Sequence, residues 1–270
     1  MREHDDSPVV GREPCPDCGS RDNLTRYASG RAYCYGTGCG RMEWPDDDGE
    51  QTTQSSRTRM ASDLIQGEIS ALRQRGISLE TAKHFGYKIG SHRGQPVHIC
   101  PLHNVDGKLV AQQLRTGDKE FPILGDFSQT PMFGTKLWSK GKKVVVTEGA
   151  LDAMSLSQIQ DNKWPVVSLP NGAAGAAKAI KSNLAYFNNF EEVILMFDAD
   201  DAGEKAAKAC APLFPAGKCS IATINGFKDA NEALMANQPR KVLEAMWNAK
   251  VYRPDGIVSL ADIREELEAP

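Results

Sequence analysis

Acidic residues follow the ends of several hydrophobic runs in the second half of this 270-residue chain. In an open parallel sheet, functional side chains collect at the carboxyl edge, where strands end and loops begin. Carboxylates crowded there repel one another unless a cation neutralises them, and Mg²⁺ takes carboxylate, water and phosphate oxygens as ligands. The acids therefore predict a divalent-metal site for phosphoryl chemistry. They are Glu148, Asp152, Asp198, Asp200 and Asp229.

Two other interpretations explain part of this acidic pattern. An Asp after a strand often caps the next helix, and Asp200 or Asp201 is placed to do so before "AGEKAAK". An Asp-x-Asp strand end also occurs in aspartyl-phosphate phosphatases. However, "DADDAG" lacks the Thr or Val that a phosphatase loop has two residues after its second Asp. The strand end at Glu148 is not part of that pattern either, so the full set favours the metal site.

Four of the seven cysteines have the spacing of metal ligands. Two and four residues separate the members of the two pairs, which are Cys15 with Cys18 and Cys34 with Cys39. A cytosolic pair of pairs is typical of a closed four-thiolate zinc site, which is structural because no position is left for water. The cytosol keeps thiols reduced, which disfavours disulfides. The sequence around Cys15 and Cys18 also does not have the pattern of a thioredoxin-like fold, which disfavours a redox pair. The remaining cysteines are expected to be small buried hydrophobes.

An alternation of strands and helices begins near residue 142 and has to position the acids. Strands are predicted over 143–149, 165–170, 191–200 and 218–224, with helices over 150–160, 173–187 and 202–214. Continuous Val/Ile runs between helices indicate a parallel sheet covered on both faces, and thus an α/β fold, α+β overall. Upstream, the pattern predicts a helix over 62–76, a second over 78–86 from Ser78 to Gly86, and a hairpin over 96–115 that turns at Asp106-Gly107.

Composition limits the class of protein. Hydrophobic residues make up 40% and charged residues 25% of the chain, as in ordinary globular proteins. The first ten residues have neither the basic nor the apolar region of a signal peptide, and no apolar run approaches the ~20 residues of a membrane helix. These features predict a cytoplasmic protein with no membrane segment. The net charge is −3, yet residues 91–143 are locally basic, as in a protein that handles a polyanion.

The domain organisation follows from a polar stretch after the cysteines. Residues 45–60 are rich in Asp, Gln, Ser and Thr, and such a stretch is typical of a flexible linker. The predicted parts are a zinc ribbon over 10–44, this linker, an N-terminal subdomain over 61–141, a second subdomain with C-terminal helices over 142–253, and a C-terminal linker over 254–270.

Longer strings make the chain resemble a known family. "VVVTEGALDAMSL" followed by "VILMFDADDAGEKAA" looks like a Toprim domain, the Glu and Asp-x-Asp metal site shared by primases, topoisomerases and some nucleases. "RGISLETAKHFGY", "FGTKLWSKGKKVVVTEG", "FPAGKCSIA" and "MWNAKVYRPDGIVSL" are similar in order and spacing to the primase half of the T-seven-like bacteriophage primase–helicases, of the DnaG-type primase superfamily. The likeness extends over nearly the whole chain.

The resemblance implies roles for particular residues. Glu148, Asp198 and Asp200 match the acids that hold the family's catalytic magnesium (or manganese) ions, and Asp152 and Asp229 match further acids of that site. The implied chemistry is two-metal nucleotidyl transfer. The positions where the family keeps basic residues for nucleotide phosphates are Arg115, Lys119 and Lys136, each of which is alternatively an ordinary surface charge.

The loop "SLPNGAAGAAK" opens a helix with small residues, so its backbone N–H groups around Asn171 and Gly172 can face phosphate. Relatives tend to have Gly and a different polar residue at positions 170 and 171. In the resembling family the zinc ribbon reads a single-stranded DNA template. Tyr33, Tyr35 and Trp44 suit base stacking there, or alternatively pack around the zinc.

The sequence thus predicts a DNA-dependent RNA primase that makes short oligoribonucleotides from NTPs on single-stranded DNA for replication. The implied partners are a replicative helicase, as a further C-terminal half or a separate chain, and a DNA polymerase. The host-cell cytoplasm is the expected location. The alternatives are another Toprim enzyme, such as a nuclease, or a non-catalytic zinc and Toprim scaffold of recombination like the RecR family. A topoisomerase needs a larger toroidal body, and no GxxxxGK[ST] P-loop for a helicase motor is present.

Overall fold

The computed structural model describes residues 7–16, 20–35, 41–43, 64–117, 121–128 and 131–253. The chain divides into two compact units, Met1–Arg57 and Thr58–Pro270. The predicted linker over 45–60 and the C-terminal linker over 254–270 lie outside the described residues.

The first unit contains a small antiparallel sheet of order β1-β2-β3-β4. Its strands are β1 (Val9–Glu13), β2 (Leu24–Tyr27), β3 (Ala32–Cys34) and β4 (Met42–Glu43). Among the described residues of this unit, the buried hydrophobic cluster consists of Cys15, Leu24, Ala32 and Cys34. A core this small needs a covalent or metal staple to hold a fold.

The second unit begins with a five-stranded antiparallel sheet of order β5-β6-β7-β8-β9. Its strands are β5 (Gly67–Glu68), β6 (Lys88–His92), β7 (Gln95–His103), β8 (Leu109–Arg115) and β9 (Ile123–Gly125). The predicted hairpin is confirmed by the pairing of β7 with β8. Gly107 in its turn has φ +75°, a conformation that glycine adopts without strain.

Helix α1 (Leu79–Phe85) lies between β5 and β6 in the chain and has the predicted ends. The Ser78 hydroxyl accepts a hydrogen bond from Thr81 N at 3.1 Å, and Gly86 ends the helix with φ +67°. Both residues act as the sequence signals indicate.

The helix predicted over 62–76 is wrong for the described part, residues 64–76. Those residues form β5 and a single 3₁₀ turn, η2 (Arg73–Arg75), which ends at Gly76 as predicted. The Gln112 side chain bonds both the N–H and the C=O of Ile65, at 2.9 and 3.0 Å. These contacts and the pairing of β5 with β6 supply the backbone partners that a helix would otherwise provide.

A second sheet, mostly parallel, has the order β11-β10-β12-β13-β14. Its strands are β10 (Gly141–Thr147), β11 (Val166–Ser168), β12 (Phe190–Met196), β13 (Cys219–Ile221) and β14 (Lys250–Val251), and β14 alone pairs antiparallel within it. The helices after α1 are α2 (Ala150–Ile159), α3 (Ala176–Ser182), α4 (Leu184–Phe187), α5 (Asp201–Cys210), α6 (Ala230–Met235) and α7 (Pro239–Trp247). The predicted mixed α/β class is confirmed.

Two predicted helices are broken in the structure. The stretch 173–187 divides into η4 (Ala173–Gly175), α3 and α4, with a break at Asn183, whose side chain bonds the Ala179 carbonyl. The stretch 202–214 becomes α5 followed by η5 (Ala211–Leu213), because Pro212 has no N–H to continue an α-helix. A further 3₁₀ turn, η3 (Thr135–Leu137), precedes β10.

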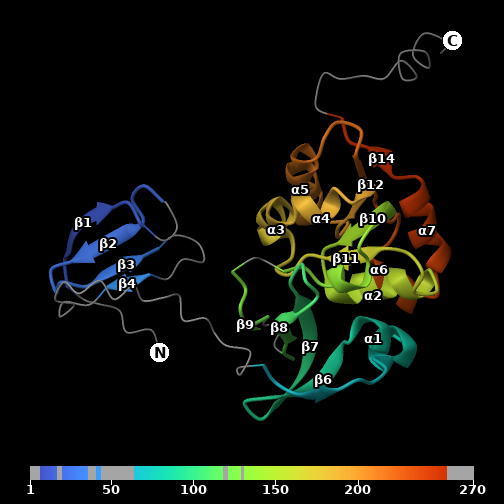
Figure 1. The fold of residues 1–270 in the computed structure, drawn as a ribbon, viewed down its shortest axis with the longest axis horizontal. Helices are drawn as coiled ribbons and strands as arrows, with labels where there is room; N and C mark the ends of the chain where they lie inside the picture. The colour runs from blue at the N-terminus through green and yellow to red at the C-terminus, as the bar shows by residue number, and fades with distance from the viewer. Residues whose placement is uncertain are drawn as a thin grey trace, which may run out of the picture. The chain divides into compact units, whose positions relative to one another are not determined.

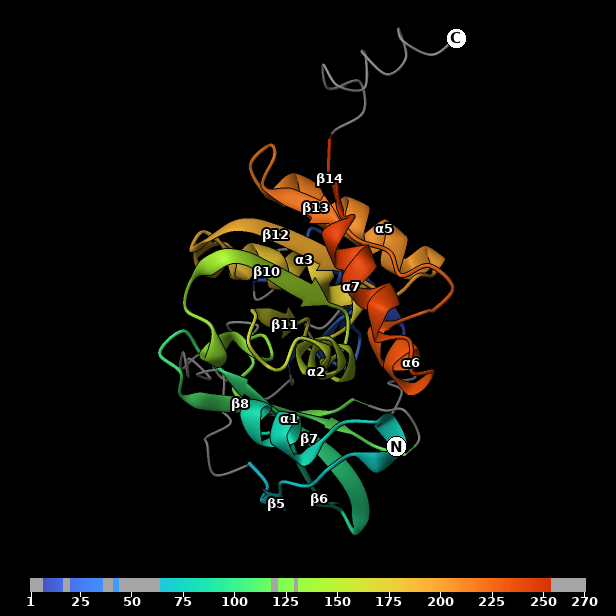
Figure 2. The same ribbon diagram turned by 90° about the vertical axis from the view of Figure 1, so that its right-hand side faces the viewer.

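Helices cover both faces of the parallel sheet (Figures 1 and 2). Val145 and Ile194 point into a cluster shared with α2, α6 and α7. Val144, Val146 and Leu195 point to the other side, into a cluster with α3, α4 and α5. Alternate residues of each strand are thus buried on opposite faces, as a parallel sheet requires.

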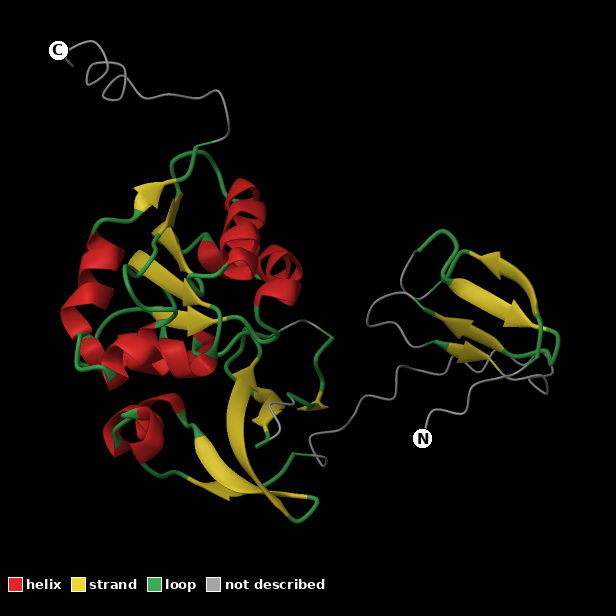
Figure 3. Ribbon diagram, turned by 180° about the vertical axis from the view of Figure 1, so that it is seen from behind, coloured by secondary structure: helices red, strands yellow, loops and turns green. Residues whose placement is uncertain are grey.

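The first of these clusters also includes Phe85, Tyr87 and Leu102, so the antiparallel sheet and α1 share its core. Figure 3 shows the two sheets of this unit one above the other, with α2 close to α1. In the described ranges, no helix has the length and apolar character needed to cross a bilayer.

Candidate active site

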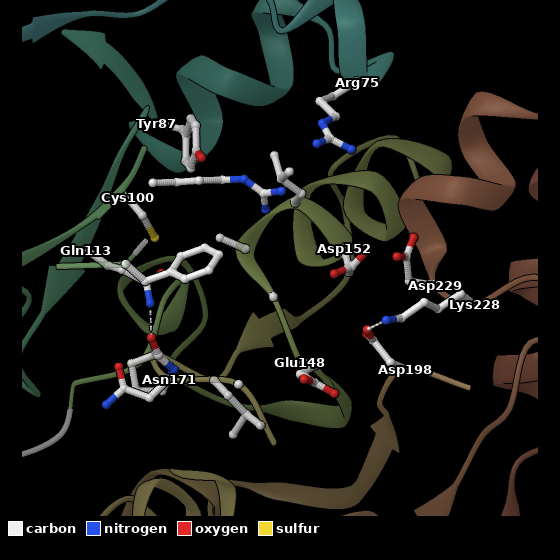
Figure 4. A pocket seen from close by; sticks show the side chains of 18 residues that line it. Arg75, Tyr87, Cys100, Gln113, Glu148, Asp152, Asn171, Asp198, Lys228 and Asp229 are labelled. Atoms are coloured by element: carbon white, nitrogen blue, oxygen red, sulfur yellow. Dashed lines mark hydrogen bonds and ion pairs between the residues drawn. The ribbon is translucent and has the colours of Figure 1, made fainter. Parts of the chain in front are cut away.

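A cavity of about 620 Å³ opens at the carboxyl edge of the parallel sheet, where the antiparallel sheet forms its other wall (Figure 4). The parallel sheet and its loops supply Glu148, Asp152, Asn171, Gly172, Asp198, Lys228 and Asp229. Side chains from the antiparallel sheet and the segments around it are Arg75, Tyr87, Cys100, Gln113, Arg115 and Phe121. The fold therefore brings four of the five predicted acids to one cavity.

Glu148 follows strand β10, and the loop after β11 holds its side chain. Ala173 N–H donates to Glu148 Oε1 at 3.1 Å. Gly172 has φ +62°, and a Cβ there would lie 3.3 Å from the same carboxylate oxygen, so glycine permits the close approach. Glu148 Oε2 is buried and has no hydrogen-bond partner in the described part of the chain. A buried carboxylate oxygen without a partner is costly unless a cation or water meets it.

Asp198 and Asp200 lie after strand β12, and Lys228 joins them. The Lys228 ammonium is 3.3 Å from Asp198 Oδ2 and 3.0 Å from Asp200 Oδ2. Asp200 also caps helix α5, since Oδ1 accepts from Ala202 N at 3.1 Å and Gly203 N at 2.9 Å. The two-residue spacing thus sends both carboxylates toward one cation, and the capping interpretation of Asp200 is confirmed as well.

Asp152 and Asp229 lie side by side at the starts of α2 and α6. Asp229 caps α6 by accepting from Glu232 N at 2.7 Å. Asp152 Oδ1 accepts from Asn231 N at 3.2 Å. The side-chain amide of Asn231 donates through Nδ2 to Arg75 O and to Ser155 Oγ, at 2.8 and 2.9 Å. This amide therefore connects both helices to the segment that carries Arg75.

The carboxylates differ in how readily they ionise. Burial, and then the charge of Glu148, raises the pKa of Asp198 to about 6, against the opposing effect of Lys228. Burial and the charges of Asp229 and Asp198 raise the pKa of Asp152 well above its usual range. The N–H of Gly203, and then Lys228, lower the pKa of Asp200. Raised acid pKa values in a cleft are typical of a site built to bind a cation or move protons.

The opposite wall of the cavity is basic and aromatic. The Arg115 guanidinium lies 5.5 Å from the centroid of the Phe121 ring. Arg75 ends the 3₁₀ turn η2 before α1 and lines the same cavity, although the sequence alone did not single it out. The Gln113 side chain donates to the Pro170 carbonyl, which ties strand β8 to the loop that carries Asn171. Two arginines facing a row of carboxylates suit a ligand with phosphates bound through a metal ion.

The acids do not form a closed metal site as they stand. Among residues 7–16, 20–35, 41–43, 64–117, 121–128 and 131–253, no three His, Cys, Asp or Glu side chains converge closely enough to hold an ion. The partnerless Glu148 Oε2 and the raised pKa of Asp198 nevertheless fit a divalent cation at this edge. The residues that would hold it are Glu148 and Asp198, with Asp200 next to them.

Other predicted nucleotide contacts are placed differently. Lys136 lines a separate cavity of about 450 Å³ with His103, Trp138 and Tyr186, so the structure does not bring it to the carboxylates. Lys119 lies outside the described residues. Arg115, Asn171 and Gly172 line the carboxylate cavity.

The predicted zinc ligands are described in part. Cys15 and Cys34 are each 1% exposed and belong to the same small cluster of the first unit. Cys15 N donates to Ser20 O at 2.8 Å. Cys18 and Cys39 lie outside the described residues. Cys15 follows β1 and Cys34 ends β3, and two buried thiols in one cluster fit a shared metal ion.

The aromatic residues of the first unit are partly accessible. Tyr35 is 56% exposed, and its ring contacts Tyr33 edge to face, with centroids 4.7 Å apart. Trp44 lies outside the described residues. Tyr35 follows strand β3, and an exposed tyrosine beside a small sheet can stack on a nucleic-acid base.

A parallel sheet with a Glu at one strand end and an Asp pair at the next, facing an antiparallel sheet, defines a Toprim-type nucleic-acid enzyme core. The chain matches the Toprim-like family model over residues 145–234, which implies use of a divalent metal ion. It also matches, over residues 67–125, the model for the N-terminal a+b fold of the bacteriophage T7 DNA helicase/primase. The chain belongs to the family of the T7-type primase–helicases and corresponds to their primase portion.

Individual relatives agree with this assignment. The DNA helicase/primase of enterobacteria phage T3 is 36% identical over 99% of this chain, which spans 49% of that protein. The primase fragment of the bacteriophage T7 primase–helicase is 36% identical, with TM-score 0.66 over 89% of this chain and 100% of that chain. A structure of T7 lagging-strand DNA polymerase with primase domains bound to an RNA/DNA hybrid and dTTP gives 40% identity and TM-score 0.67 over 70% of this chain and 99% of that chain. The chain thus spans about half the length of the T3 protein.

Proposed function

We propose that this chain is a DNA-dependent RNA primase, which joins NTPs into short oligoribonucleotides on a single-stranded DNA template for replication. The observation that carries the proposal is the cavity in which four acids of a Toprim sheet face Arg75 and Arg115. A polymerase active site needs anchored acids for metal ions and basic groups for the incoming triphosphate, and this cavity holds both.

The acids are assigned distinct tasks. Glu148, Asp198 and Asp200 hold the divalent ions, magnesium or manganese, and Asp152 and Asp229 add negative charge beside them. When bound, such ions supply activation of a 3′-hydroxyl and neutralisation of a leaving pyrophosphate. Glu148 is oriented for this task by the Ala173 N–H. No protein nucleophile is required, because positioning and charge neutralisation provide the catalysis.

The basic wall binds the nucleotide. Arg115 and Arg75 provide planar donors for triphosphate oxygens, and the loop at Asn171 and Gly172 offers backbone N–H groups. We assign Lys119 to the same role on sequence alone. Lys136 lines the second cavity, so we do not assign it to nucleotide binding at the carboxylates.

The first unit is assigned to template reading. We propose that Cys15, Cys18, Cys34 and Cys39 hold a structural zinc ion, and that the sheet presents Tyr35 to single-stranded DNA. By analogy with relatives named as helicase/primases and with a primase in complex with a DNA polymerase, the partners are a replicative helicase and a DNA polymerase. We propose the host-cell cytoplasm as the place of action.

The direct test is incubation with single-stranded DNA of varied sequence, labelled NTPs and Mg²⁺, followed by separation of the products. We expect short RNA products from the wild type and from Asp161→Asn, which changes an exposed acid far from the cavity. Asp198→Asn should reduce synthesis at least a hundredfold. Cleavage of the DNA without RNA products would instead identify a Toprim nuclease, and no product of either kind would contradict the enzyme assignment.

A further inference from the structure

Lys228 occupies an unusual position among the acids of the cavity. Its ammonium contacts Asp198 at 3.3 Å and Asp200 at 3.0 Å, and Figure 4 shows the side chain reaching across from the α6 side toward Asp198. The sequence alone did not single out this lysine. One positive charge here serves two of the three acids that are proposed to hold metal.

The backbone of Lys228 is fixed by two hydrogen bonds, whereas its side chain is half exposed and held by ion pairs. Lys228 N donates to Glu232 Oε2 at 2.5 Å, and Lys228 O accepts from Ala199 N at 2.7 Å. The second bond attaches Lys228 directly to the residue between Asp198 and Asp200. The side chain itself is 54% exposed and lines the cavity. The ammonium can therefore leave the carboxylates while the loop keeps its place.

Glu148 provides the contrast within the same site. Its Oε2 is buried and meets no partner in the described ranges, whereas the oxygens of Asp198 and Asp200 that face Lys228 are already neutralised. A divalent cation that binds Asp198 and Asp200 must take the place of the ammonium, because two cations repel each other at contact distance.

We propose that Lys228 is a displaceable internal counter-ion: it holds Asp198 and Asp200 until a metal ion enters, and its released ammonium then binds an oxygen of the nucleotide's polyphosphate. The inference rests on the proposed function, since it takes the metal ion and the nucleotide from it. In this role Lys228 links metal occupancy to nucleotide affinity. It prevents repulsion between the acids before metal binds, and it adds one positive charge to the phosphate side of the cavity afterwards.

The first test measures metal binding without nucleotide or DNA. Mn²⁺ is titrated into the full chain, and free Mn²⁺ is followed by electron paramagnetic resonance. Half-exposed ion pairs are weak competitors, so Lys228→Met should bind Mn²⁺ about two- to fivefold more tightly than the wild type. Lys208→Met is the matched control, because it removes one lysine paired to Glu204 at 2.6 Å on α5, away from the cavity, and should leave the affinity unchanged. Equal affinity of Lys228→Met and the wild type would overturn the proposal.

The second test measures nucleotide binding at saturating Mg²⁺. A lost charge-assisted contact to phosphate should weaken NTP binding by Lys228→Met about tenfold, and Lys228→Arg should restore most of it. Unchanged NTP affinity would refute the second half of the proposal.

Different results would contradict the proposed function and the counter-ion role of Lys228. If Asp198→Asn binds Mn²⁺ as the wild type does, the proposed metal site is wrong and the counter-ion role falls with it. If Lys228→Met shows tighter Mn²⁺ binding in a protein that makes no RNA, the counter-ion role stands and only the primase assignment is lost.

Discussion

Replacing Asp198 by asparagine is expected to stabilise the metal-free fold at neutral pH, although this residue is a proposed metal ligand. The Asp198 side chain is 18% exposed, and burial together with Glu148 raises its pKa from an ordinary 3.8 to about 6. A carboxyl group with a raised pKa is ionised less readily in the folded than in the unfolded chain. Its ionisation at neutral pH therefore lowers the free energy of unfolding.

The size of this effect follows from the two pKa values. At about 1.36 kcal/mol per pH unit, the difference corresponds to about 3 kcal/mol at pH 7.5. Well below the unfolded-state pKa of 3.8 the group is protonated in both states, and the fold loses no stability. The loss of stability grows as pH rises from there through the folded-state pKa of about 6. The attraction of Lys228 is already contained in this difference. With some loss of hydrogen bonding by the amide, we expect Asp198→Asn to gain about 1–3 kcal/mol at pH 7.5 and about half as much at pH 5.

The assay is urea denaturation in buffer without added divalent cations, at pH 5 and pH 7.5. Asp161→Asn serves as control, because Asp161 is 79% exposed and should change little at either pH. A variant no more stable than the wild type at pH 7.5 would refute the reasoning. A gain that is as large at pH 5 as at pH 7.5 would also refute it, since the cause would then not be the ionisation of Asp198.

Three further predictions concern residues that shape the two units. Gly203→Ala would bring a Cβ to 2.1 Å from the Asp198 carbonyl oxygen, so urea denaturation should show a loss of about 1–3 kcal/mol. Gly117→Ala meets no atom within 4 Å and should show no such loss. Phe133→Ala removes a ring that is 1% exposed and should cost about 3–5 kcal/mol, and an unchanged melting temperature would contradict its place in the core. Cys34→Ser should lower the zinc content of the purified protein toward zero, and stoichiometric zinc by atomic absorption would exclude this cysteine as a ligand.

The sequence predicted elements well where a local signal decides the structure. Ser78 and Gly86 set the ends of α1 through contacts within a few residues of each. Glu148 and Asp198 reach one cavity because any parallel sheet gathers its carboxyl ends at one edge. Neither inference needs knowledge of the rest of the fold.

Features that depend on distant contacts were missed. The stretch around Ile65 has helical spacing, yet Gln112, 47 residues away, supplies its backbone partners. Neither Arg75 nor Lys228 directly follows a predicted strand, so the sequence pattern does not mark them as site residues. Both line the cavity only when the two sheets are assembled. For Lys228, its position directly before Asp229 was the one available signal.

The separate core of the first unit has an evolutionary consequence. Among the described residues, the cluster of Cys15, Leu24, Ala32 and Cys34 draws on no side chain beyond residue 57. Recombination that exchanges this unit between related genomes would therefore carry its described core along intact. A lineage can in this way replace the unit proposed to read the template in one event.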